Sequence, residues 1–155
     1  MRVLVNNAGA SGVVVDEARL RALNIDPETW RIRREELRNE LNDIETLNEE
    51  KLEAILKRFL HDLKEHRLEA GGWSLMLPTY SISKATLNAY TRVLAKRYPN
   101  MLINCVHPGY VNTDLNWHTG PMTVEEGARG PVKCALLPNG GPTGYYFDQT
   151  EVAGF

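Results

Sequence analysis

A continuous apolar strand that ends in small residues restricts most strongly how this chain can fold. Residues 2–7 read Arg-Val-Leu-Val-Asn-Asn and run directly into Ala-Gly-Ala-Ser-Gly at 8–12. An uninterrupted apolar strand is typical of a parallel sheet that helices cover on both faces. The small residues that follow predict that the carboxyl end of this strand borders a ligand cleft.

Helices and strands alternate along the remainder of the chain. Four further segments carry helix or strand signals, namely a helix over 79–97, a strand over 101–107, a helix from Thr123 to about 137 and a strand over 144–147. Pro99 ends the first helix, and Thr123 with Glu126 forms a capping box at the start of the second. Strand, helix, strand, helix and strand in this order indicate an α/β fold with a mainly parallel sheet.

Residues 16–70 differ from the rest because they are polar, highly charged and helical. Thr46 with Glu49 has the spacing of a capping box, and Gly71-Gly72 marks the end of the helix that follows. Six apolar residues recur in this helix at intervals of three and four, namely Leu52, Ile55, Leu56, Phe59, Leu60 and Leu63. This stripe predicts packing against the domain, which we favour over binding of a partner helix.

Composition limits the classes of function that remain. The 155 residues suit one domain, and a formal net charge of −2 argues against nucleic acid or an anionic membrane as a bulk partner. Because no segment has the length of a membrane helix or the pattern of a signal peptide, we expect a cytoplasmic protein. Cys105 and Cys134 lie in apolar runs, which predicts buried unpaired thiols, and no metal-ligand spacing predicts a zinc site.

The residues best suited to chemistry are Tyr80 and Lys84. They stand four residues apart at the start of the helix over 79–97, so both side chains project from one face. An ammonium group near a phenol favours the phenolate, and this can draw the tyrosine pKa toward neutrality, where a phenol becomes an effective general acid. Taken alone, Tyr-x-x-x-Lys also fits an ordinary half-exposed pair on a helix.

Three motifs in a fixed order make the pair more specific. Asn6-Asn7-Ala8-Gly9 follows the first strand, Tyr80-Ser81-Ile82-Ser83-Lys84 opens a helix, and Pro108-Gly109-Tyr110-Val111-Asn112-Thr113 follows the next strand. This set resembles the short-chain dehydrogenase/reductase family. The runs around Asn88 and Asn104 and the tail at 137–144 resemble its plant monomeric carbonyl reductases, the branch of menthone- and salutaridine-type reductases.

The resemblance implies a fold and a reaction. Residues 1–155 would form a single partial Rossmann-like domain, an incomplete doubly wound parallel sheet with a helical insertion at about 26–72. The reaction would be NADPH-dependent reduction of a small-molecule carbonyl to an alcohol, with Tyr80 as the proton donor and Lys84 as its activator. The insertion covers the surface that other members use to oligomerise, so a monomer is expected.

The resemblance also implies which residues border the cofactor. Asn7, Ala8 and Gly9 match the strand end beside it, and Lys84 matches the lysine that holds the nicotinamide ribose. Four residues match the nicotinamide and pyrophosphate side, namely Pro108, Gly109, Val111 and Thr113.

This chain departs from the family pattern at two places. The glycine-rich turn that holds the pyrophosphate has no counterpart in the sequence, and neither Ser11 nor Ser74 occupies the place of the catalytic serine. The strand that carries this serine would lie between the strands matching 2–7 and 101–107. The resemblance thus describes a chain shortened at its N-terminus and internally. Two alternatives to an enzyme follow, a catalytically inactive remnant and an interaction module that pairs with a full-length relative.

Overall fold

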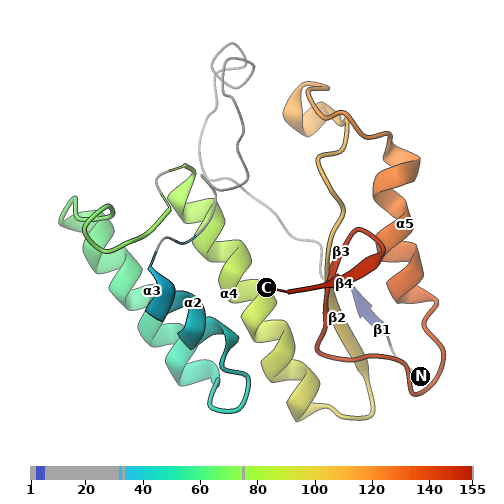
Figure 1. Cartoon of the computed structure of the whole chain (residues 1–155), viewed down its shortest axis with the longest axis horizontal. Coiled ribbons are helices and arrows are strands. Elements are labelled where there is room, and N and C mark those ends of the chain that lie inside the picture. The colour runs from blue at the N-terminus through green and yellow to red at the C-terminus, as the bar shows by residue number, and fades with distance from the viewer. Residues whose placement is uncertain (1–2, 6–31, 33, 75, 155) are drawn as a thin grey trace.

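The structure is a computed structural model that describes residues 3–5, 32, 34–74 and 76–154. A four-stranded sheet lies at its centre, with helices on both sides (Figure 1). The strands follow one another in space in chain order, as β1 (Val3–Val5), β2 (Leu102–His107), β3 (Tyr146–Asp148) and β4 (Glu151–Ala153). β1 pairs with β2 and β2 with β3 in parallel, whereas β4 turns back antiparallel to β3.

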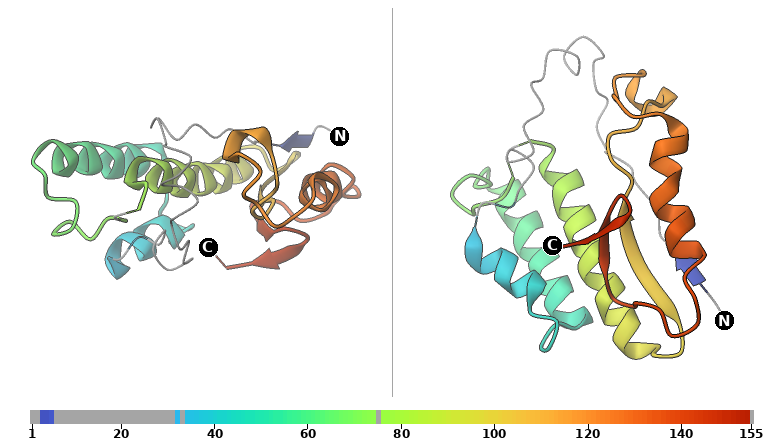
Figure 2. Two further views of the ribbon diagram at one scale, coloured as in Figure 1. Left: turned by 90° about the horizontal axis from the view of Figure 1, so that it is seen from above. Right: turned by 45° about the vertical axis from the view of Figure 1, so that its right-hand side comes forward.

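Helices cover the two faces of this sheet in different ways. α4 (Pro78–Arg97) lies on one face and α5 (Val124–Ala135) on the other, as the view from above in Figure 2 shows. α2 (Glu35–Asn42) and α3 (Glu49–Lys64) form a further layer outside α4. The expected α/β architecture is therefore present in this part of the chain. The short hairpin partner β4 was not predicted.

β1 and β2 are direct neighbours, although the family pattern places another strand between them. Val3 is paired with Leu102 and Val5 with Asn104. Direct pairing gives the backbone groups of β2 on this side their hydrogen-bond partners. Without this pairing, buried backbone groups at the edges of β1 and β2 would lack partners, which is destabilising by about 1–3 kcal/mol for each group.

The helical layer has its own apolar core. Trp73 is 2% exposed, its ring meets Phe59 edge-on with 5.2 Å between centroids, and its Nε1 donates to Asp62 Oδ2 at 3.0 Å. The core comprises Ile32, Leu37, Leu41, Leu47, Leu52, Ile55, Phe59, Trp73, Ile82, Ala89 and Val93. Because Ile82, Ala89 and Val93 belong to α4, the stripe of α3 packs against the domain as predicted. The stripe is narrower than expected, since Leu56 and Leu60 are exposed.

Both predicted ends of α3 are wrong. Asn48, rather than Thr46, caps the helix, because Asn48 Oδ1 accepts from the backbone N of Lys51 at 2.9 Å. Thr46 bonds instead to Asp43, in the turn after α2. α3 ends at Lys64, several residues before Gly71-Gly72, and turns that include His66 at a positive φ of 55° fill the interval. The turn-forming side chains Asn48 and Asp43 therefore outcompete the expected capping box.

The capping box predicted at Thr123 is present. The Thr123 N donates to Glu126 Oε2 at 2.8 Å, and the Glu126 N donates to Thr123 Oγ1 at 3.2 Å. We expect Thr123→Ala to lower the free energy of unfolding by about 1 kcal/mol, because one N–H of the first turn of α5 loses its acceptor. Urea unfolding measures this change. Thr123→Ser keeps the hydroxyl and is the matched control; an equal loss in both variants would contradict the capping role.

Cys105 and Cys134 are both buried free thiols, as predicted. Burial raises the pKa of Cys105 to about 11, so its thiol stays protonated at neutral pH and is a poor nucleophile.

In the described part of the chain, none of the helices combines the length and the apolarity that crossing a membrane requires.

Candidate active site

Helix α4 presents Tyr80 and Lys84 from its first turns. Pro78 is the first helical residue, where its missing N–H costs nothing, and Leu77 before it adopts a left-handed conformation with φ 44°. Lys84 Nζ lies 5.6 Å from the centroid of the Tyr80 ring. This separation is within cation–π range, so the predicted pair forms a contact in the structure.

The electrostatics of the pair differ from the expectation. Burial raises the pKa of Tyr80 and lowers that of Lys84, because water is withdrawn from the charged form of each group. From the sequence, Lys84 was expected to lower the Tyr80 pKa. The structure gives the opposite direction, since the ammonium lies over the ring and desolvation of the phenolate dominates. Tyr80 is therefore a phenol that holds its proton at neutral pH.

The serine nearest to this pair in the preceding loop makes a structural contact. Ser74 is 2% exposed, and its hydroxyl donates to the Met76 carbonyl oxygen at 2.9 Å. The hydroxyl of Ser81 donates to the same oxygen at 3.3 Å. Both hydroxyls therefore stabilise the turn that leads into α4.

The segment after β2 folds back on itself and then enters α5. The Asn112 N donates to the Met122 carbonyl oxygen at 2.8 Å, and the Met122 N donates to the Tyr110 carbonyl oxygen at 3.3 Å. These bonds pair Val111 with Met122 in an isolated parallel bridge. Asn116 Nδ2 also donates to the Val111 carbonyl oxygen at 2.7 Å. The predicted cofactor residue Val111 thus sits in a fixed stretch of backbone.

The side chain of His118 makes two polar contacts within the loop that follows β2. Its Nδ1 lies 2.7 Å from Asn112 Oδ1, and its Nε2 lies 3.0 Å from Asp114 Oδ1. The predicted cofactor residue Thr113 lies between these partners and directly precedes the 3₁₀ helix Asp114–Asn116. The sequence analysis gave His118 no role, and the structure places it on the surface of this loop.

Gly109 is required where the predicted turn Pro108-Gly109 leaves β2. Its φ is +88°, a conformation that other residues rarely adopt, and a Cβ there would lie 2.2 Å from Met122 Sδ. The side chain of Met122 therefore occupies the space beside Gly109 that a Cβ would need. Asn7, Ala8 and Gly9, the other predicted cofactor residues, lie outside the described residues.

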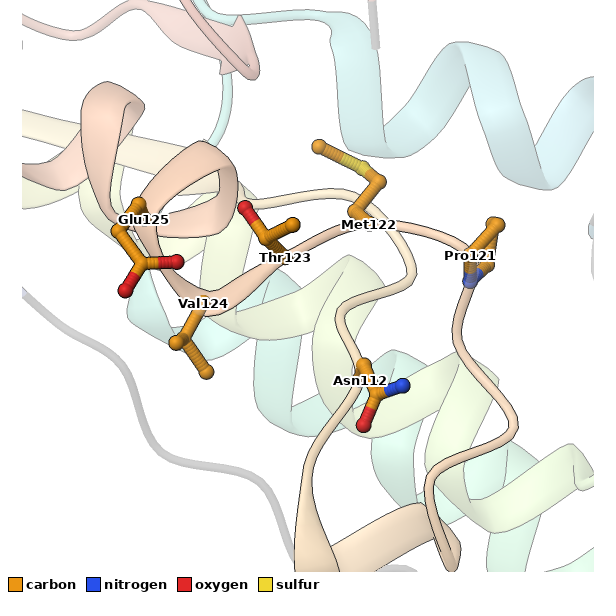
Figure 3. A pocket seen from close by; sticks show the side chains of 6 residues that line it. All are labelled: Asn112, Pro121, Met122, Thr123, Val124 and Glu125. Atoms are coloured by element: carbon orange, nitrogen blue, oxygen red, sulfur yellow. The ribbon is translucent and has the colours of Figure 1, made fainter.

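A pocket of about 270 Å³ opens between this loop and the first turn of α5 (Figure 3). It is lined by Asn112, Pro121, Met122, Thr123, Val124 and Glu125. Asn112 separates Val111 from Thr113, so the pocket adjoins two predicted cofactor residues. Sequence reasoning missed the lining at 121–125, although the capping box at Thr123 marked the start of the helix.

The described site residues form two groups at one end of the sheet. Figure 1 shows the start of α4, with Tyr80 and Lys84, at the same end as the loop that follows β2. This is the carboxyl end of the parallel strands, where ligands bind in open α/β sheets. The pocket beside the loop is lined by neither Tyr80 nor Lys84, so the two groups share an end of the sheet but not a described cavity.

Comparison with known proteins identifies the class. A scan against protein-family models finds no match. The chain is 50% identical over 121 residues to Short-chain dehydrogenase/reductase 1 of Saponaria officinalis, an alignment that covers 78% of this chain and 40% of that protein. It is 38% identical over 100 residues to Carbonyl reductase [NADPH] 3 of Rattus norvegicus, covering 61% of this chain and 35% of the relative.

A solved structure agrees with these relatives. The structure of salutaridine reductase from Papaver somniferum superimposes with a TM-score of 0.72 at 36% identity, covering 94% of this chain and 44% of that chain. The fold is therefore that of a Rossmann-type oxidoreductase over the shared part. The chain belongs to the short-chain dehydrogenase/reductase family, in the branch of the plant neomenthol dehydrogenases and salutaridine reductases. It spans 35–40% of the length of the plant relatives it matches.

Proposed function

We propose that this chain carries the proton-donating part of an NADPH-dependent carbonyl reductase. The observation that supports this most directly is the Tyr80–Lys84 contact of 5.6 Å at the start of α4, in a chain of this family. Tyr80 donates its phenolic proton to the carbonyl oxygen of a ketone or aldehyde as that oxygen becomes an alkoxide. Its raised pKa keeps the proton on the phenol until it is needed.

The described residues fit one end of a dinucleotide. The pocket of about 270 Å³ beside Val111 and Thr113 is slightly smaller than typical ligand pockets, so it could hold only a small part of a dinucleotide. When bound, NADPH supplies the hydride. Lys84 would hold the nicotinamide ribose hydroxyls, and Gly109, Val111 and Thr113 would border the nicotinamide and pyrophosphate, with Pro108. By the resemblance, Asn7, Ala8 and Gly9 would also contribute to cofactor binding, although they lie outside the described residues.

A second candidate is a chain that has the fold of the family but no turnover. The direct pairing of β1 with β2 favours it, because the family strand that carries the catalytic serine would occupy this position. From the resemblance we also propose a monomer, and the packing of α2 and α3 against α4 supports this proposal. Binding of the cofactor separates the first candidate from the second.

Calorimetric titration of the purified chain with NADPH, with NADH alongside, tests the proposed function. We expect saturable NADPH binding with a Kd on the order of micromolar. Lys84→Ala should weaken it, because the ammonium group that holds the ribose is removed. Lys57→Ala is the matched control, since Lys57 is an exposed lysine of α3. If no binding is detected at millimolar NADPH, the proposed function is wrong and the chain has the fold of the family without turnover.

A further inference from the structure

Two buried glycines lie directly against Val111. Gly120 lies in the loop between β2 and α5, and Gly127 lies near the start of α5. A Cβ on Gly127 would lie 2.3 Å from Val111 Cγ2, and a Cβ on Gly120 would lie 2.4 Å from the carbonyl carbon of Val111. Both separations are below 3.0 Å, so a methyl group at either position would force Val111 to move. Val111 is thus held at its side chain by Gly127 and at its backbone by Gly120.

The helix itself gives no reason for a glycine at position 127. Glycine in a helix interior is less favourable than alanine by about 1 kcal/mol. Gly127 has no positive φ, and its N–H donates to the Thr123 carbonyl oxygen at 3.0 Å, as in any helical turn. The backbone conformation therefore does not require glycine here, whereas the contact with Val111 does. The Cβ of Val111 itself would lie 3.3 Å from the added group, a tight contact that turning the valine side chain does not change.

The N–H of Val111 points away from Met122. Met122 accepts from the Asn112 N and donates to the Tyr110 carbonyl oxygen. The bridge thus uses the neighbours of Val111, and in a parallel bridge the central residue directs its own N–H and carbonyl group to the opposite side. The Val111 carbonyl oxygen accepts there from Asn116 Nδ2 at 2.7 Å. The Val111 N–H on this side is the backbone donor that, by the family resemblance, is expected to meet the nicotinamide.

We propose that Gly127 is a positioning residue for the cofactor: its missing side chain lets Val111 pack against α5, which places the Val111 N–H for the nicotinamide end. Gly127 acts through Val111 rather than through a contact of its own with the ligand. The inference rests on the proposed function for the identity of the ligand. The contact between Gly127 and Val111 does not depend on that function, so the two can be tested separately.

Calorimetric titration with NADPH and thermal unfolding, on the same variants of the full chain, test this role. Gly127→Ala should raise the Kd for NADPH about tenfold, the loss expected when one hydrogen bond is displaced. It should also lower the Tm, although alanine is the better helix former and would raise the Tm if the contact were absent. In the Val111→Ala background, where both valine methyl groups are gone, Gly127→Ala should cost much less in both measurements.

Gly130→Ala is the matched control, because Gly130 is the other buried glycine of α5. A Cβ there would lie 2.3 Å from the Gln149 carbonyl oxygen, an equally close approach to a different neighbour. Gly130→Ala should lower the Tm and leave the Kd for NADPH unchanged, and Val111→Ala should not relieve its effect. Equal losses of NADPH affinity in the two alanine variants, or a loss in Gly127→Ala that Val111→Ala does not relieve, would overturn the proposal.

Amide hydrogen exchange without cofactor separates failure of this inference from failure of the proposed function. The N–H groups of Asn112 and Met122 make the two bonds of the bridge, so displacement of Val111 in Gly127→Ala should speed their exchange about tenfold. Unchanged exchange would overturn the inference. If Gly127→Ala fails to fold, adding Val111→Ala should restore folding, and a double variant that also fails would overturn the inference. If exchange changes as expected and the wild-type chain binds no NADPH, the positioning of Val111 stands and the proposed function is wrong.

Discussion

Replacing Tyr80 with phenylalanine is expected to abolish reduction of a carbonyl substrate by this chain. The substitution removes the phenolic hydroxyl and keeps the ring that contacts Lys84. A positioned general acid contributes roughly 10²- to 10⁴-fold to such a step, so the residual rate should fall to the background of NADPH oxidation. Consumption of NADPH with a panel of ketones and aldehydes measures the effect. Tyr98→Phe, at a 47% exposed tyrosine that follows α4, is the control.

Lys84→Ala separates the two roles proposed for this pair. It should reduce turnover severely and also weaken NADPH binding, whereas Tyr80→Phe should leave binding unchanged. Burial raises the pKa of Tyr80 above its ordinary value of 10.0, so the phenol is largely protonated between pH 7 and 9. The wild-type reduction rate should therefore show no loss from Tyr80 deprotonation between pH 7 and 9. Full activity of Tyr80→Phe would remove the catalytic assignment.

Trp73→Ala is expected to be the most destabilising single substitution in the helical layer. Trp73 is 2% exposed, packs edge-on against Phe59 and donates to Asp62. Truncating a buried tryptophan costs about 3–5 kcal/mol, because packing is lost and a cavity remains. Since small domains are stable by only about 5–15 kcal/mol, a large part of the folded population would be lost near physiological temperature.

Two comparison variants make the result interpretable. Leu60→Ala truncates a residue of the same predicted apolar stripe that is 52% exposed, so its effect should stay within about 0.5 kcal/mol. Trp73→Phe keeps most of the ring packing and removes the bond to Asp62, so it should fall between the other two. Urea unfolding followed by circular dichroism measures all three. Equal small effects of Trp73→Ala and Leu60→Ala would mean that the layer has no packed core.

Local signals allowed several elements to be predicted from the sequence. α4 was expected over 79–97 and spans Pro78–Arg97, because Pro99 ends the helical segment. β2 was expected over 101–107 and spans Leu102–His107. The capping box at Thr123 placed the start of α5, since both of its hydrogen bonds form within four residues. The contact of Tyr80 with Lys84 followed from helical spacing alone.

Features that depend on tertiary contacts could not be predicted in the same way. The direct pairing of β1 with β2 joins distant parts of the chain and has no local signal. The pKa direction of Tyr80 depends on how much water the folded chain removes, which spacing does not reveal. The pocket lining at 121–125 arises because the loop after β2 folds back through Met122. At Asn48, a single turn residue displaced the expected helix start.

The pairing of Val3 with Leu102 also determines the order in which the chain can fold. Closing a loop of about 100 residues costs more entropy than forming any helix or hairpin of this chain, so this contact forms late. During synthesis β1 emerges first, yet its partner strand is made only after α2, α3 and α4. β1 is therefore paired late although it precedes the other described elements in the chain, and until then β2 lacks this neighbour. Exposure of an unpaired apolar strand during this interval predicts that misassembly of newly made chains is concentrated at β2.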